Sequence, residues 1–171
     1  MINNIFNYSF FVTSYVATSK SKEFYIYESS GANLGNLLQH RCVVLTLPGA
    51  FTPTCTLKHV PDFEAQYDLI LSYGIKNIYI MTSNDYWTHR VWADAMRIKK
   101  LKFISDYELT FGNHFGNALY RNELGVRNRR EIIIFDKCKI EKRITEQYES
   151  NIDDPYDKTQ SKNLLDYLKT L

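Results

Sequence analysis

Short, continuous apolar runs alternate with longer segments of helical periodicity along this chain. The apolar runs occupy residues 42–47, 77–82, 101–104 and 131–135. Runs of this length, bounded by turn residues, predict buried strands. Helical periodicity predicts helices over residues 34–39, 54–72 and 110–119, and a further helix that Asn84 or Asp85 caps and that runs to Met96. A last amphipathic helix follows, with apolar positions that include Leu164, Leu165 and Leu168.

The remaining segments predict connections and outer strands. Residues 6–16 are apolar but interrupted by polar side chains, so we expect an edge strand or a ragged lead-in rather than a targeting remnant. Residues 23–28 predict a strand that ends in a turn at Ser30 and Gly31. Residues 131–135 and 139–145 predict an antiparallel hairpin. Loops are expected after Gly125, where arginines gather, and over the acidic residues 146–157.

Strands that alternate with helices and then give way to a hairpin and a closing helix predict an α/β sandwich. We expect a mostly parallel centre in its sheet and one domain over residues 1–171. Residues 1–22 would form a flexible or edge-strand extension. In sheets of this kind the functional crevice lies beyond the carboxyl ends of the parallel strands.

Composition excludes several classes of protein. The chain has 171 residues, 44% of them hydrophobic, which suffices for a sizeable core. Its net charge of +2 is too mild for a nucleic-acid or membrane-surface protein, and it lacks the run of about 18 apolar residues that a membrane span needs. Three cysteines without a C-x-x-C pair argue against a zinc site and against a secreted disulfide scaffold. We therefore expect free thiols in a reducing compartment: the cytoplasm, or an organelle if the N-terminal segment is a targeting remnant.

The candidate chemistry lies in residues 43–63, which read VVLTLPGAFTPTCTLKHVPDF. A buried strand leads into a turn rich in proline and glycine, and Cys55 follows on the first turn of a helix. The positive end of the helix dipole and its unpaired N–H groups favour a thiolate there. Since the thiolate is the nucleophilic form of cysteine, this segment predicts a reactive thiol.

These residues resemble a known family. PGAFTPTC is similar to the peroxiredoxin signature Pro-x-x-x-Thr-x-x-Cys, which falls on Pro48, Thr52 and Cys55. The following KHVP resembles the type-5 branch, whose fold is thioredoxin-like. Residues 84–96, 103–106 and 127–130 resemble later segments of that branch, so the likeness covers roughly residues 33–136.

The resemblance implies a thioredoxin-like three-layer sandwich with a mixed, mostly parallel central sheet. It also implies a peroxidase, an oxidoreductase that needs no metal or cofactor. Cys55 would attack a hydroperoxide and become a sulfenic acid. Thr52 would hold its hydroxyl against the sulfur, Arg130 would stabilise the developing charge, and Pro48 would shield the sulfur from water.

Other site residues follow from the same resemblance. The substrate-binding residues would be Gly49, Phe51, Thr54 and Phe111, the last as a wall of the pocket. Arg129 is the alternative to Arg130 as the active-site cation, and the whole arginine run could instead be a solvated surface. His59, one turn beyond Cys55, has either a local structural role or a role in proton transfer. A place in the core or in a dimer contact is expected for Trp87 and Trp92, and it is the alternative to substrate binding for Phe51.

No second cysteine is expected to resolve the sulfenic acid. By strand rise, Cys42 lies roughly 17–20 Å and Cys138 about 25 Å from the active site, whereas a disulfide needs Cα atoms within about 7 Å. We expect a one-cysteine mechanism with an external reductant, glutathione with glutaredoxin or else thioredoxin. The resemblance also implies a homodimer. The alternative functions are a redox sensor and a non-catalytic thioredoxin-fold binding module.

One departure from the family pattern bears on the site. Glu131 replaces an aromatic residue after Arg130 and could draw the guanidinium away from the sulfur. Adjacent side chains of a strand face opposite sides of the sheet. We therefore expect Glu131 to point away from Cys55.

Overall fold

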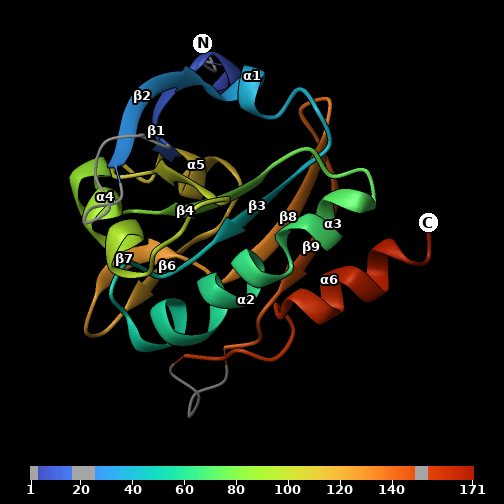
Figure 1. Ribbon diagram of the computed structural model, residues 1–171. Coiled ribbons are helices and arrows are strands. Elements are labelled where there is room, and N and C mark those ends of the chain that lie inside the picture. The colour runs from blue at the N-terminus through green and yellow to red at the C-terminus, as the bar shows by residue number, and fades with distance from the viewer. Residues whose placement is uncertain (1–3, 17–25, 149–153) are drawn as a thin grey trace.

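A seven-stranded mixed sheet organises the protein (Figure 1), whose computed structural model describes residues 4–16, 26–148 and 154–171. The strand order is β2-β1-β5-β4-β3-β8-β9. The strands are β1 (Ser9–Val16), β2 (Ile26–Asn33), β3 (Cys42–Thr46), β4 (Ile78–Thr82), β5 (Lys102–Ser105), β8 (Glu131–Asp136) and β9 (Lys139–Thr145). The three central strands β3, β4 and β5 are parallel, and the outer strands pair antiparallel.

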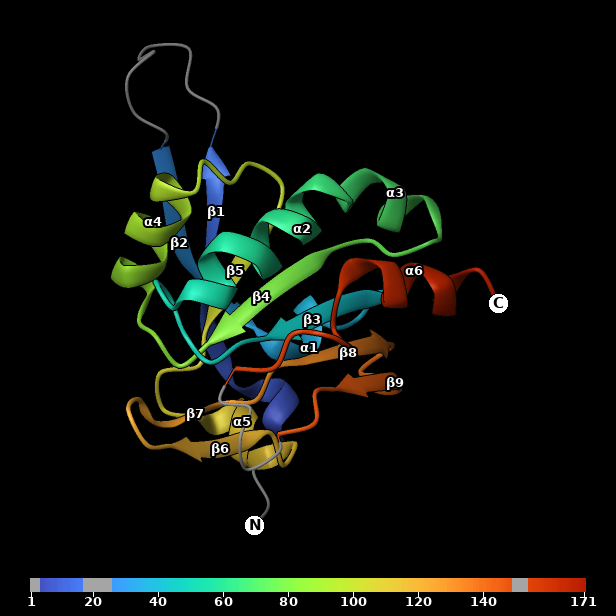
Figure 2. The ribbon, with the colours of Figure 1, turned by 90° about the horizontal axis from the view of Figure 1, so that it is seen from below.

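Helices cover both faces of this sheet, as Figure 2 shows from below. One face carries α2 (Val60–Ala65), α3 (Tyr67–Ser72), α4 (Tyr86–Ala95) and α6 (Ser161–Leu168). The other carries the 3₁₀ turn η1 (Ile5–Asn7), α1 (Leu34–Leu37) and α5 (Thr110–His114). The predicted three-layer α/β sandwich with a parallel centre is confirmed. No helix in the described ranges is long and apolar enough to span a bilayer.

Burial on both faces explains why the central strands are apolar at every position. All five residues of β3 are buried. Val43 and Leu45 pack into the core beneath α2 and α6, whereas Val44 packs into the core beneath α1 and α5. A parallel strand covered by helices on both sides needs such a continuous apolar run.

The N-terminal strands differ from the prediction. β1 is not an edge strand, because it lies between β2 and β5. The predicted turn at Ser30 and Gly31 is also wrong: β2 continues through both residues, which pair with Val12 and Phe11 of β1. Tertiary pairing with β1 therefore overrides the local turn preference of Ser-Gly. Residues 17–25, which include part of the predicted extension and strand, lie outside the described residues.

Two predicted helices are interrupted. The helix expected over 54–72 consists of the π-helix η2 (Cys55–His59), α2 and α3, with a break at Gln66. The helix expected over 110–119 ends as α5 at His114, close to Gly116 with its positive φ of 66°. The predicted arginine-rich loop is instead a hairpin of β6 (Ala118–Arg121) and β7 (Gly125–Asn128).

The hairpin of β8 and β9 is confirmed, as is the closing helix. Lys137 and Cys138 form its turn with positive φ values of 48° and 62°, and this backbone geometry matches the right-handed twist of a tight hairpin. Because β8 runs antiparallel to β3, Glu131 at its start lies opposite Thr46 at the end of β3. This register brings Arg130 to the segment that follows β3.

Candidate active site

The turn from Pro48 to Pro53, here called the catalytic turn, follows β3 at the carboxyl end of the central strands. It is held at two points: the Thr52 hydroxyl donates to the Gly49 carbonyl over 2.9 Å, and the Ala50 N–H donates to Asn84 Oδ1 over 2.8 Å. Asn84 follows β4, the neighbour of β3. The turn is therefore fixed to the ends of two parallel strands, where a functional crevice is expected.

Cys55 begins the helical segment after this turn. It is the first residue of η2, and the Val60 N–H donates to its carbonyl in a π-type bond. Short π-helical segments are frequent at functional sites. The side chain is 0% exposed and belongs to the core on the α2 side of the sheet. A reagent that reacts with this sulfur must therefore reach a buried atom.

Arg130 places its guanidinium against the sulfur. Its Nη1 donates to Cys55 Sγ over 3.4 Å and contacts His59 Nδ1 over 3.1 Å. The arginine is itself 0% exposed, and its backbone N–H donates to the Tyr148 hydroxyl over 2.8 Å. The structure thus brings together the cysteine and the arginine that the sequence singled out, although 75 residues separate them.

His59 engages both of its ring nitrogens. Nε2 lies 2.7 Å from the Thr159 carbonyl, which can only accept, so Nε2 carries the proton. Nδ1 is then the acceptor for Arg130 Nη1. Burial and the adjacent guanidinium hold the pKa of His59 well below its usual range, although the Thr159 carbonyl acts in the opposite direction. A neutral imidazole in this state orients Arg130 and has no free nitrogen for proton transfer.

Asp154 binds the other terminal nitrogen of the guanidinium. Arg130 Nη2 donates to Asp154 Oδ1 in a short ion pair. Burial opposes the charge on Arg130, but Cys55 and Asp154 outweigh it and raise the pKa of Arg130 above its ordinary value. The cation beside the sulfur is therefore retained at every physiological pH.

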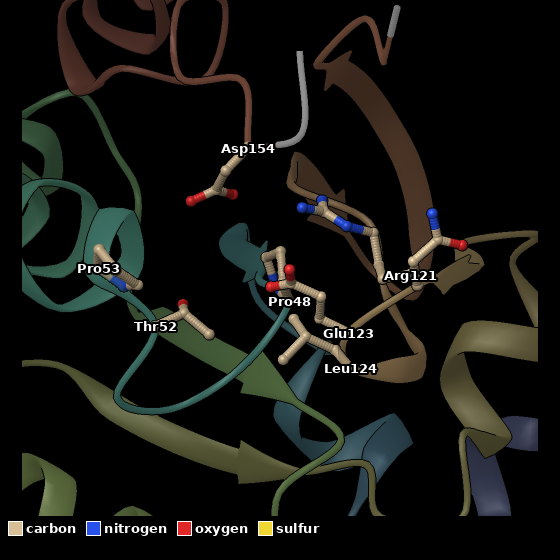
Figure 3. A pocket seen from close by; sticks show the side chains of 8 residues that line it. Pro48, Thr52, Pro53, Arg121, Glu123, Leu124 and Asp154 are labelled. Atoms are coloured by element: carbon tan, nitrogen blue, oxygen red, sulfur yellow. The ribbon is translucent and has the colours of Figure 1, made fainter. Parts of the chain in front are cut away.

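A cavity of about 170 Å³ lies beside these groups. Figure 3 shows Asp154 and Arg121 reaching into it from different sides, with Pro48 and Thr52 below them. Its lining is Pro48, Thr52, Pro53, Arg121, Asn122, Glu123, Leu124 and Asp154. It therefore connects the catalytic turn with the carboxylate that pairs with Arg130.

The neighbouring charged residues face elsewhere. Arg127 donates to the Leu124 carbonyl and to Ser83 Oγ, and the Arg129 guanidinium lies 6.0 Å from the Tyr148 ring. Glu131 accepts from Asn117, Arg143 and Thr145 on the opposite side of β8. Of these groups, Arg130 is the one that contacts Cys55, and Glu131 turns away as strand alternation predicts.

The structure brings some of the predicted substrate-binding residues to this site and not others. Gly49 and Phe51 belong to the catalytic turn, and Thr54 precedes Cys55 directly. Phe111 is fully buried in the core on the opposite face of the sheet, where its ring packs at a tilt against Phe115 with the two centroids 4.5 Å apart. Phe111 therefore does not reach the cavity.

Sequence reasoning missed three groups at the site. Asp154 and Thr159 reach Arg130 and His59 from the segment before α6, and Tyr148 binds the backbone of Arg130. The acidic composition of residues 146–157 indicated a loop but carried no signal of where it folds. The only clue that could have pointed to Asp154 is that a buried arginine needs a carboxylate partner.

Comparison with known proteins settles the family. Residues 28–159 match the Redoxin family model. The chain is 32% identical over 134 residues to Peroxiredoxin y4vD of Sinorhizobium fredii (strain NBRC 101917 / NGR234), covering 76% of this chain and 71% of that protein. This chain belongs to the peroxiredoxin family. The peroxiredoxin is accordingly a thiol-dependent peroxidase.

Two solved structures support the same assignment. One, described as a peroxiredoxin, superposes with a TM-score of 0.79 at 29% identity and covers 85% of this chain and 88% of its own. The other is the Plasmodium falciparum antioxidant protein, described as a 1-Cys peroxiredoxin, with a TM-score of 0.78 at 31% identity, covering 84% of this chain and 87% of its own.

Proposed function

We propose that this peroxiredoxin is of the type-5 branch and reduces hydrogen peroxide and alkyl hydroperoxides with Cys55 as its single redox-active cysteine. The observation that carries the proposal is the 3.4 Å contact between Arg130 Nη1 and Cys55 Sγ. PGAFTPTC followed by KHVP supports the branch. The likeness to a solved protein described as a 1-Cys peroxiredoxin supports the single cysteine.

The chemistry begins with attack of the Cys55 thiolate on the terminal peroxide oxygen. A sulfur–oxygen bond forms, the oxygen–oxygen bond breaks, and the leaving oxygen takes a proton to become water or an alcohol. Arg130 stabilises the thiolate and the charge that develops on the oxygens. Its buried Nε atom has no hydrogen-bond partner among the described residues, so we assign this donor to a peroxide oxygen.

The catalytic turn supplies the other roles. Thr52 lines the cavity and lies one helical turn before Cys55, so its hydroxyl can leave the Gly49 carbonyl and bind an incoming peroxide. Pro48, which is buried and also lines the cavity, limits the access of water to the sulfur. Backbone N–H groups around Thr54 and Cys55 are further donors at the start of the helix. The cavity is the route by which we expect peroxide to approach.

The sulfenic acid is then reduced by an external thiol, with glutathione and glutaredoxin as the first choice and thioredoxin as the second. A thiol displaces water from the sulfenic acid to form a mixed disulfide, and a second thiol releases Cys55. Cys42 pairs with Phe135 at the end of β3 remote from the catalytic turn, and the Cys138 N–H donates to Leu38 in the same region. This placement supports a reaction without an internal resolving cysteine.

Peroxide consumption by matched variants tests this mechanism. Cys55→Ser should abolish thiol-dependent turnover of hydrogen peroxide, whereas a variant carrying both Cys42→Ser and Cys138→Ser should retain it. Mass spectrometry of peroxide-treated wild-type protein should find oxidised Cys55 and no intramolecular disulfide. A disulfide between Cys55 and either other cysteine, formed at the rate of turnover, would contradict the one-cysteine mechanism. Comparing glutaredoxin with thioredoxin as the reductant identifies the donor.

A homodimer is part of the proposal. Three exposed apolar side chains belong to the catalytic turn and to α4: Phe51 is 53%, Trp87 60% and Val91 63% exposed. Trp87 and Val91 lie one turn apart on α4, and the Phe51 ring lies 6.4 Å from Trp92 of the same helix. Contiguous exposed apolar groups mark contact surfaces. Sedimentation analysis should find a dimer that Trp87→Glu weakens.

A further inference from the structure

Asp154 stands between the cavity and the active-site arginine. Arg130 is fully buried and uses Nη1 for Cys55 and His59. Its Nη2 is paired with Asp154, whose side chain is 30% exposed. The carboxylate is thus the accessible end of the ion pair. A molecule that approaches Nη2 from the cavity meets this negative charge first.

The charged residues of the described lining leave the charge of Asp154 uncompensated within the cavity. They are Arg121, Glu123 and Asp154, and since Arg121 and Glu123 carry opposite charges, the described lining has a net charge of −1. Arg121 also lies with its guanidinium 5.3 Å from the Tyr148 ring, and Figure 3 shows it reaching towards Asp154. The Arg121 guanidinium therefore faces the Asp154 carboxylate (Figure 3). The buried guanidinium of Arg130 pairs with the same carboxylate.

We propose that Asp154 is a specificity-determining residue that favours uncharged hydroperoxides over hydroperoxides that carry a carboxylate near the peroxide group. The proposal rests on the reduction of peroxides by Cys55 described above. An anionic substrate would lose hydration in the cavity and approach a carboxylate that already occupies Arg130 Nη2. An uncharged hydroperoxide has no such repulsion. It needs only hydrogen bonds from the donors around Cys55.

The partial burial of the pair makes this effect measurable. Charges in partly buried surroundings are screened less by salt than exposed charges are. Two like charges a few ångströms apart near a protein surface repel by an amount that changes a rate constant by roughly tenfold or more. Replacing Asp154 with asparagine keeps the shape and removes the charge, so it isolates the electrostatic part of the selection.

The test uses two substrates that differ by one charge, 3-hydroperoxy-3-methylbutanoate and its methyl ester. The quantity measured is the ratio of kcat/KM for the ester to kcat/KM for the acid. Wild-type protein should prefer the ester by about tenfold, and added salt should narrow this preference. Asp154→Asn should reduce the ratio roughly fivefold. Glu123→Gln removes a cavity charge that does not pair with Arg130, and should change the ratio by less than about twofold.

The outcomes separate this inference from the proposed function. An Asp154→Asn ratio equal to that of wild type overturns the role of Asp154, as does a wild-type preference for the acid, which would make Arg121 the dominant charge. Should Asp154→Asn impair folding, Asp154→Ser removes the same charge with a smaller side chain, and a ratio equal to that of wild type in this variant also overturns the role of Asp154. If hydrogen peroxide consumption does not require Cys55, the proposed mechanism fails and this inference fails with it.

Discussion

At the scale of single residues, the site depends on how one guanidinium distributes its donors. Arg130 binds the sulfur and His59 through Nη1 and Asp154 through Nη2. Its charge is retained because Cys55 and Asp154 outweigh burial. An arginine can bind several partners in fixed directions because its guanidinium group is planar and rigid. A lysine at this position could offer one point charge but not this geometry.

Substitution of Arg130 tests this dependence directly. Arg130→Gln should lower kcat/KM for hydrogen peroxide by roughly 100-fold, because charge on the reacting oxygens loses its main stabilising group. Arg130→Lys should recover only part of the loss. The measurement is stopped-flow oxidation of the protein by peroxide, under the same conditions for each variant.

The adjacent arginine provides the matched control. Arg129 faces the Tyr148 ring rather than the sulfur, so Arg129→Gln should change kcat/KM by less than about threefold, as is usual for a partly exposed charge. Equal losses from Arg129→Gln and Arg130→Gln would show that the positive charge of the segment matters and that the contact with Cys55 does not.

Sequence reasoning found the pair of Cys55 and Arg130 but not their surroundings. The family signature and the register of the arginine run identified those two residues. Asp154 could not be found, because several carboxylates occur between residues 146 and 157 and only the folded path of the chain selects one. Phe111 was expected at the cavity, yet α5 packs on the far face of the sheet and carries it there.

At the scale of elements, the ends of β3 and β4 determine the geometry of the catalytic turn. Asn84 accepts from the Ala50 N–H and from the Thr82 hydroxyl. Thr82 also contacts His89 of α4 over 2.7 Å, and His89 contacts Ser105 of β5. A chain of hydrogen bonds therefore joins α4 and two strands to the turn before Cys55.

The start of α4 carries a testable cap. The sequence left Asn84 and Asp85 as alternative caps, and the structure selects Asp85, whose Oδ1 accepts from the Thr88 N–H over 2.9 Å. Asp85→Ala should lower the free energy of unfolding by about 1 kcal/mol, whereas Asp85→Asn should retain most of it. Urea denaturation of the two variants measures the difference. Equal destabilisation by both would show that the charge, rather than the hydrogen bond, is responsible.

Elements with strong apolar patterns were predicted well, and those set by tertiary pairing were not. β3, β4 and β8 follow from apolar runs, and β9 follows from the turn after β8. The hairpin of β6 and β7 was missed because its strands are only four residues each and mostly half-exposed. Such strands lack the apolar alternation by which a strand is recognised.

At the scale of the whole molecule, buried histidines couple stability to pH. Burial lowers the pKa of His89 to about 3, with Asp85 acting in the opposite direction, and the pKa of His59 is also depressed. Burial raises the pKa of Asp106 to about 6, although hydrogen bonds from Phe111 and Gly112 oppose the shift. The histidines bind protons more readily in the unfolded chain, and Asp106 binds them more readily in the folded protein.

The free energy of unfolding should therefore fall as the pH drops from about 7 towards 4. In the unfolded chain, His59 and His89 gain protons below about pH 6.5. In the folded protein both remain neutral at this pH, so protonation favours the unfolded chain. Protonation of Asp106 in the folded state offsets part of this loss between about pH 6 and 4. Urea midpoints at several pH values measure the slope. His89→Gln, which keeps an amide donor, should give a shallower slope, and an unchanged slope would exclude His89 as a source.

The position of β1 has a practical consequence for anyone shortening this chain. The family match begins at residue 28, whereas β1 covers Ser9–Val16 and pairs with β5. A version trimmed to the family boundary would lack β1 and would expose the backbone donors and acceptors of β5 on the side away from β4. Exposed edge strands of this kind pair with strands of other molecules. The trimmed protein should aggregate or exchange strands between molecules, whereas in the intact chain β1 pairs with this edge of β5.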